Sequence, residues 1–168
     1  ISICDDDVVD LTNLQRQIVH FTDSIGKQKV DSARATLSRI NPEITVNAIA
    51  ERVTGARLEQ LVAGAAVVID ATDNFATRHA INRACARHRR PLVSGAGVRF
   101  DGQLAVFDLR RDDSPCYECL FPENAETEDT RCAVLGVFAP LVGVIGTLQA
   151  AEAIKLLTGT GKTLAGRL

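Results

Sequence analysis

The sequence contains no methionine, and it opens inside a short apolar segment, Ile1-Ser2-Ile3. We therefore expect that the natural protein has an N-terminal portion that precedes Ile1. At the other end, residues 162–168 have the composition of the beginning of another strand. Both observations predict that residues 1–168 belong to a single domain and are a fragment of it.

An excess of positive charge is also missing. The chain has 19 basic and 21 acidic residues and a net charge of −2. Domains that track nucleic-acid phosphates usually carry a basic excess, so this balance argues against a nucleic-acid carrier but leaves room for a local anion site. The first residues lack the basic region of a signal peptide and become acidic at Asp5.

The five cysteines are odd in number and irregular in spacing, which does not suit a disulfide scaffold and favours a reducing, cytoplasmic setting. What the chain does have is a hydrophobic content of 46% over 168 residues. That content is enough for one soluble globular domain with a hydrophobic core.

Strand-like and helical patterns alternate through residues 1–95. Strands are predicted at residues 1–4, 44–48, 65–71 and 92–95, and helices at residues 13–21, 27–40, 57–63 and 72–90. This order predicts an α/β fold with a doubly wound, Rossmann-like, mostly parallel sheet, and residues 1–95 would be its nucleotide-binding half. The run 65–71 is apolar except for Asp70, as in strands that are covered on both faces.

Residues 96–168 have a different pattern. Asp101-Gly102 between two apolar runs predicts an antiparallel hairpin, and the acidic residues 123–130 predict a mobile loop. Residues 133–157 predict a long apolar helix whose length approaches that of a membrane span. Its glycines, its proline and the nearby Glu152 and Lys155 favour a buried helix or a subunit interface instead.

Residues 4–29 concentrate polar side chains without the period of a surface helix or strand. In doubly wound folds, ligands bind beyond the carboxyl ends of the strands, and a carboxylate there can hold both ribose hydroxyls. Asp5 is the candidate for that contact, although Asp5 to Asp7 could equally cap the next turn. Arg16 and Lys29 could bind phosphate, with Asn13 and Gln17 as neutral donors, or all four could be solvated surface residues.

Two further groups suggest metal ions. Asp73 lies where a loop should follow a strand, and it could hold Mg²⁺ together with substrate phosphates; a helix N-cap is the alternative. Cys116 and Cys119 form a C-x-x-C pair, which is half of a structural zinc site. Cys132 could be a further ligand, but a second pair outside this chain is the more natural expectation. Cys85 is predicted in the core and Cys4 in a structural position.

Taken together, these motifs resemble the ThiF/MoeB family, the bacterial relatives of ubiquitin-activating enzymes. The motifs occur in the family's order over essentially the whole chain: Asp5-Asp6-Asp7-Val8-Val9, Asn13-Leu14-Gln15-Arg16-Gln17, Gly26-Lys27-Gln28-Lys29-Val30, Thr72-Asp73-Asn74, Pro115-Cys116-Tyr117-Glu118-Cys119, Gly136-Val137-Phe138-Ala139-Pro140 and Gln149-Ala150-Ala151-Glu152.

The resemblance implies that ATP and Mg²⁺ are used to adenylylate the C-terminal glycine carboxylate of a ubiquitin-like sulfur carrier that ends in Gly-Gly. Asp5 would hold the ribose; Asn13, Arg16 and Lys29 would contact the phosphates, with Gln17 in support; and Asp73 would serve the metal and the reaction centre. Cys116 and Cys119 would bind Zn²⁺, and Cys132 could join covalently to the carrier. A homodimer in thiamine or molybdopterin synthesis, without nucleic acid or membrane, is expected.

One departure from the family pattern is clear: the family's Gly-rich nucleotide loop and its preceding strand have no counterpart in this chain, and neither has the second zinc pair. We expect them outside residues 1–168. The sequence is also compatible with two other functions. One is a dinucleotide-dependent oxidoreductase on a Rossmann-like fold, for which no hydride partner is visible. The other is a non-catalytic, zinc-stabilised dimer module, which leaves the polar residues 13–16 unexplained.

Overall fold

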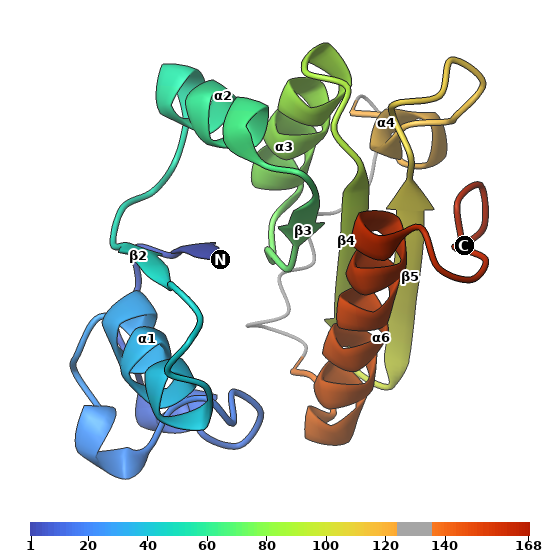
Figure 1. Ribbon diagram of the computed structural model, residues 1–168. Coiled ribbons are helices and arrows are strands. Elements are labelled where there is room, and N and C mark those ends of the chain that lie inside the picture. Colours follow the sequence, from blue (N-terminus) through green and yellow to red (C-terminus); the bar gives the residue numbers. More distant parts are fainter. Residues whose placement is uncertain (124–135) are drawn as a thin grey trace. The chain divides into compact units, whose positions relative to one another are not determined.

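The computed structural model describes residues 1–123 and 136–168 (Figure 1). The chain forms two compact units, Ile1–Thr54 and Gly55–Leu168, which are described separately below. Each unit holds its own sheet. The prediction that residues 1–95 are the nucleotide-binding half and residues 96–168 a separate part stays a prediction.

The first unit is a small β-α-β arrangement. Strand β1 (Ser2–Cys4) lies parallel to β2 (Asn47–Ile49), and helix α1 (Lys29–Ile40) stands between them in the chain. Val9, Val30, Ala33 and Val46 are the buried apolar residues of this unit. The predicted α1 is confirmed with a start two residues later than expected, and both strands are shorter than predicted.

A helix over residues 13–21 was predicted wrongly. Two short 3-10 helices occur instead, η1 (Leu11–Asn13) and η2 (Thr22–Ser24), with turns between them. The reason is local: Asp10 and Asn13 exchange hydrogen bonds as a capping box, which closes a tight turn. Leu11 and Ile18 are exposed, so no apolar stripe favours a longer helix there.

The second unit contains a three-stranded mixed sheet in the order β3-β4-β5. Strand β3 (Val68–Asp70) is parallel to β4 (Leu92–Val98), and β4 is antiparallel to β5 (Asp101–Phe107). Helix α2 (Gly55–Gly64) precedes β3, and α3 (Phe75–Arg87) connects β3 to β4. The predicted strand–helix–strand order is therefore confirmed.

Helices cover both faces of this sheet, as the doubly wound prediction requires. Leu92 and Phe107 pack on one face with buried residues of α2 and α3, including Val62 and Cys85. Val93 and Val106 point to the other face and pack with Leu156 of α6 (Ala139–Thr158). Adjacent residues of β4 thus serve opposite faces, because strand side chains alternate.

The hairpin was predicted correctly but its turn was misplaced. Asp101 and Gly102 belong to β5, and the chain reverses at Arg99 and Phe100, with Arg99 at φ 51°. Gly102 has a packing role: a Cβ there would lie 2.8 Å from Ile145 and 2.9 Å from Leu141 of α6. Glycine therefore permits the close approach of helix and strand rather than the turn.

Helix α6 starts at Ala139, later than predicted. It is long and apolar enough to cross a membrane, but only 17% of its most apolar stretch is buried. Val144, Leu148, Ile154 and Leu157 are exposed. The expectation of a buried helix is therefore wrong for much of its surface, while that of a subunit interface stays a prediction.

Candidate functional site

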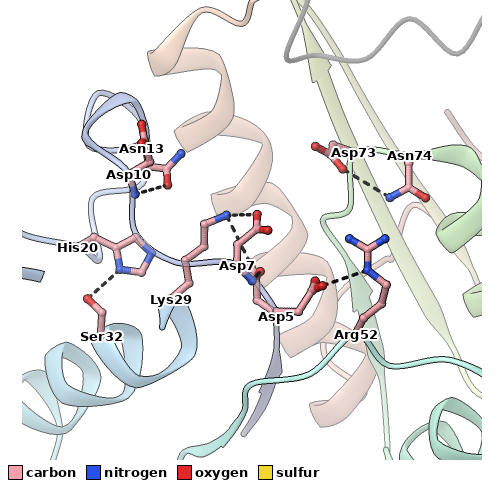
Figure 2. Close-up of polar contacts among 11 residues, drawn as sticks. Asp5, Asp7, Asp10, Asn13, His20, Lys29, Ser32, Arg52, Asp73 and Asn74 are labelled. Carbon is pink, nitrogen blue, oxygen red and sulfur yellow. Dashed lines mark hydrogen bonds and ion pairs between the residues drawn. The ribbon is translucent and has the colours of Figure 1, made fainter. Parts of the chain in front are cut away.

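The acidic turn after β1 is tied to the beginning of α1. Lys29 Nζ lies 2.7 Å from Asp7 Oδ2 and 3.7 Å from Asp5 Oδ2, and the Lys29 amide donates to the Asp7 carbonyl oxygen (Figure 2). The Lys29 side chain is 13% exposed, whereas that of Asp7 is 62% exposed. An ion pair with so exposed a partner is weak, so Lys29 can exchange Asp7 for a phosphate oxygen at little cost.

Asp5 uses one carboxylate oxygen in a local turn, and its contact with a ribose stays a prediction. Its Oδ1 accepts a hydrogen bond from the Asp7 amide at 2.9 Å, which makes the local turn of the capping alternative. Its Oδ2 has only the distant contact with Lys29 among the interactions of the described part of the chain. One oxygen is therefore structural, and the other is available to a hydroxyl ligand. Asp6 instead pairs with Arg52 at 3.0 Å.

Asn13 has a structural role that its sequence context did not reveal. It is buried, and its Oδ1 accepts from the Asp10 amide at 2.9 Å. Asp10 in turn accepts from the Thr12 amide and hydroxyl at 2.8 and 2.6 Å. The Thr12 hydroxyl, followed by the Thr12 amide, lowers the pKa of Asp10. This leaves the Asn13 side-chain nitrogen, Nδ2, as the group that could contact a ligand.

Arg16 and Gln17 extend from the same turn. Arg16 Nη1 donates to the Thr12 carbonyl oxygen at 3.1 Å, which leaves most of its donors for an anion. The Gln17 Oε1 atom is buried without a hydrogen-bond partner in the described structure. The structure thus brings Asn13, Arg16 and Gln17 together on one turn of the first unit.

His20 was not predicted to matter. It is buried, and its Nδ1 lies 2.9 Å from the Ser32 hydroxyl of α1. Burial, followed by the charge of Lys29, lowers its pKa, while Asp5 opposes that shift. The imidazole is therefore neutral at pH 7 and fastens the turn to α1.

In the second unit, Asp73 is not the helix N-cap. Asn74 caps α3, and its Oδ1 accepts from the Thr77 amide at 2.9 Å. The Asp73 carboxylate is exposed and has one long contact, 3.5 Å from Asn74 Nδ2, among the interactions of the described residues (Figure 2). The capping alternative is therefore wrong, and the carboxylate is accessible to a cation.

The C-x-x-C pair has the geometry of two ligands of one zinc ion. Cys116 Sγ and Cys119 Sγ lie 3.8 Å apart, and tetrahedral zinc with Zn–S bonds of about 2.3 Å separates two sulfurs by about 3.8 Å. Burial raises the pKa of Cys116, but hydrogen bonds from Asn82 and from the amides of Cys119 and Glu118 outweigh it, so the pKa lies below its ordinary value. A thiolate is the form that binds metal.

Asn82 of α3 holds this pair in place. Its Nδ2 lies 3.6 Å from Cys116 Sγ, and its Oδ1 accepts from the Tyr117 amide at 2.9 Å. Cys116 is the N-cap of a short helix, α4 (Tyr117–Leu120). Cys132 and most of the predicted mobile loop lie outside the described residues.

The two structural cysteine predictions have different outcomes. Cys85 is fully buried in the core as predicted, and burial raises the pKa of its thiol to about 12. This thiol is therefore unreactive. Cys4 lies in β1 and is exposed, as is Ser2, so this strand is not buried, and the structural role of Cys4 stays a prediction.

Comparisons with known proteins place the chain in one group. It matches the model of the ThiF family over residues 1–168. It is 46% identical to the molybdopterin-synthase adenylyltransferase of Escherichia coli over 171 residues, covering 100% of this chain and 67% of that protein. It is 47% identical over 166 residues to the sulfur carrier protein ThiS adenylyltransferase of Escherichia coli, covering 99% and 65%.

Among solved structures, Escherichia coli MccB crystallised with MccA-N7isoASN superposes with a TM-score of 0.81 at 25% identity, covering 98% of this chain and 50% of that one. The chain therefore spans between half and about two thirds of the length of these relatives. The Rossmann-like α/β architecture and the resemblance found in the sequence are both confirmed. The chain belongs to the ThiF family.

Proposed function

We propose that this chain is the adenylylating part of an enzyme that activates a small ubiquitin-like sulfur carrier with ATP. The relatives are named for molybdopterin synthase, for the sulfur carrier ThiS and, in Haloferax volcanii, for a SAMP protein. Each of these three is at least 44% identical over nearly the whole chain. Thiamine and molybdopterin synthesis are the two pathways to test first.

In this reaction, an oxygen of the carrier's C-terminal carboxylate attacks the α-phosphorus of ATP, and pyrophosphate leaves. The carboxylate is already ionised at neutral pH, so no general base is needed. Catalysis then consists of positioning the reactants and neutralising the charge on the phosphate oxygens. Lys29 and Arg16 supply positive charge, Asn13 and Gln17 supply neutral contacts, and Asp5 Oδ2 serves the ribose.

Asp73 is assigned to Mg²⁺ and the reaction centre. The observation that carries this assignment is that Asn74, and not Asp73, caps α3. An exposed carboxylate with nearly all of its hydrogen-bonding capacity unused suits Mg²⁺, which typically takes one or two carboxylates and substrate phosphates. Bound Mg²⁺ would neutralise charge on the phosphates.

Cys116 and Cys119 are assigned to Zn²⁺ as two of its four ligands, on the basis of the 3.8 Å separation of their sulfurs. We assign the exposed apolar side chains of α6 to the interface between the two subunits of a homodimer. We further propose that the enzyme is cytoplasmic. Cys132 stays a candidate for covalent attachment to the carrier. Mass spectrometry of wild type and Cys132→Ala with carrier and ATP tests this role, which an equal adduct in both proteins would contradict.

The direct test of the function is ATP–pyrophosphate exchange by the full-length protein. We expect exchange that depends on a carrier ending in Gly-Gly and that disappears when the last glycine is removed from the carrier. ThiS-type and MoaD-type carriers tested side by side separate the thiamine and molybdopterin pathways. Absence of exchange with both carriers would refute the proposal, and tight NAD binding without an effect of ATP would support the oxidoreductase alternative instead.

A further inference from the structure

Asp70 is the polar residue that interrupts the apolar run 65–71. Within this run, Asp70 is buried and the apolar residues around it are partly or fully exposed. It is 1% exposed at the end of β3, whereas the preceding Ile69 is 48% exposed. A buried carboxylate is costly unless hydrogen bonds satisfy it. Its surroundings therefore show what it holds.

The Asp70 carboxylate joins the following loop to the neighbouring strand. Its Oδ1 accepts from the Thr72 amide at 2.9 Å and from the Thr72 hydroxyl at 2.8 Å. Its Oδ2 accepts from the hydroxyl of Ser94 at 3.0 Å, the residue directly opposite in β4. Both oxygens are used, and Thr72 is held at two atoms.

The backbone of Asp70 is held from α6. Gln149 is buried, and its Nε2 donates to the Asp70 carbonyl oxygen at 2.7 Å and to that of Val93 at 3.2 Å. Gly95 makes room for this amide, because a Cβ at Gly95 would lie 2.4 to 2.7 Å from the Gln149 side-chain atoms. The end of β3 is thus held by both β4 and α6.

The other side of the loop is held by α3. Arg78 donates a hydrogen bond to the Thr72 carbonyl oxygen, and Asn74 caps the helix through the Thr77 amide. Asp73 lies between Thr72 and Asn74, so the residues on both sides of it are held while its own carboxylate is exposed.

We propose that Asp70 is a positioning residue for adenylylation, which acts by holding Thr72 and thereby the direction of the Asp73 carboxylate. The inference rests on the proposed function and assigns no contact with ATP to Asp70. Charge-assisted hydrogen bonds are stronger than neutral ones, which is a reason for a carboxylate at this buried position. A ligand of Mg²⁺ must be held in a narrow range of orientations because the ion requires nearly octahedral geometry.

A double-mutant cycle in the full-length protein tests the proposal. Asp70→Ala should lower the rate of carrier-dependent ATP–pyrophosphate exchange by about 10- to 100-fold, the effect typical of residues that orient metal ligands. In an Asp73→Ala background, the same change should lower the remaining rate less than about threefold, since Asp70 acts through Asp73. An equal factor in both backgrounds would show a general structural role and overturn the proposal.

Glu152→Gln is the matched control. Glu152 is also a buried carboxylate of this unit, and it also accepts from a backbone amide, that of Leu164 at 2.8 Å. Its replacement should leave exchange within about twofold of wild type at a temperature where all proteins are folded. Should Asp70→Ala fail to fold, Asp70→Asn and Ser94→Ala replace it in the cycle. Each should then show a smaller loss that again depends on Asp73.

Failure of the proposed function can be told apart from failure of this inference. If wild type shows no exchange with either carrier, amide hydrogen exchange decides the inference without reference to activity. The Thr72 amide should exchange at least tenfold faster in Asp70→Ala than in wild type, and the Thr77 amide, which donates to Asn74 Oδ1, should follow it. Unchanged rates at both amides would mean that Asp70 does not hold the loop.

Discussion

Lys29 and Asp7 are 22 residues apart in the chain, and the Lys29 Nζ atom lies 2.7 Å from an Asp7 carboxylate oxygen. The contact presents a lysine amine beside Asp5, the residue assigned to the ribose. Because Asp7 is mostly exposed, the pair stabilises the fold little and leaves the lysine available to a phosphate.

Lys29→Ala and Arg16→Ala should each lower ATP–pyrophosphate exchange by at least about 100-fold, the scale for loss of one transition-state contact. Asp7→Asn removes the ion-pair partner of Lys29 but keeps the positive charge of Lys29, and should change the rate less than about fivefold. Exchange rates under saturating carrier measure all three. Near-normal activity of either alanine variant would refute its assigned role.

Asp73→Ala should likewise lower exchange by at least about 100-fold, because it removes the proposed Mg²⁺ ligand. Asp101→Ala, which changes an exposed aspartate of the same unit at the hairpin, is the control and should leave the rate unchanged. Rates are compared over a series of Mg²⁺ concentrations. Equal activity of wild type and Asp73→Ala across the series would contradict the assignment.

His20 should make the stability of the protein depend on pH. Its pKa in the folded protein lies below the ordinary value of about 6.5, so the unfolded chain binds the proton more readily. Its contribution is therefore fully present above pH 6.5 and is lost as pH falls through that value toward the lowered pKa. Urea unfolding at several pH values should show a steeper loss for wild type than for His20→Asn, and parallel curves would contradict the prediction.

Gly102→Ala should destabilise the fold by about 1–3 kcal/mol, because the new methyl group would be forced against Ile145 and Leu141. Gly143→Ala is the matched control: it lies in α6 with nothing within 4 Å of a new Cβ, so alanine should stabilise by about 0.5–1 kcal/mol. Denaturant midpoints measure both changes. A shift of the same sign in the two variants would show that the close helix–strand contact is not what selects glycine.

The purified full-length protein should contain about one zinc ion per chain, and Cys116→Ser or Cys119→Ser should lose most of it. Cys4→Ser, in the other unit, should retain the metal. Elemental analysis of the intact proteins gives the ratios. Normal zinc content in both variants of the pair would show that these sulfurs are not ligands.

Local patterns predicted part of this molecule well. The helical pattern predicted at residues 27–40 agrees with α1 to within two residues. The alternation of strands and helices predicted the β-α-β units, and the family motifs predicted the membership that the comparisons confirm. These features were readable because each depends on neighbours in the chain.

Other features depend on partners that are distant in sequence. Asp101-Gly102 reads as a turn, and only the approach of α6 shows that its glycine serves packing. Asp70 reads as an interruption of an apolar strand, and only Ser94 and Gln149 show that it is buried and satisfied. Asp73 and Asn74 are equally good N-caps by residue type. Only the structure shows that the extended Asn74 is the residue whose side chain accepts from the Thr77 amide.

The sequence by itself determined the family, the order of the elements and the residue types available for nucleotide, magnesium and zinc, because these follow from local periodicity and short motifs. Only the tertiary structure decided which side chains are used up by the fold and which are left for ligands. Asn13 and Asp5 each use one side-chain oxygen to accept a hydrogen bond within a turn, whereas the Asp73 carboxylate makes one long contact. The physical reason is that hydrogen-bonding capacity is settled by the groups that folding brings within about 3 Å.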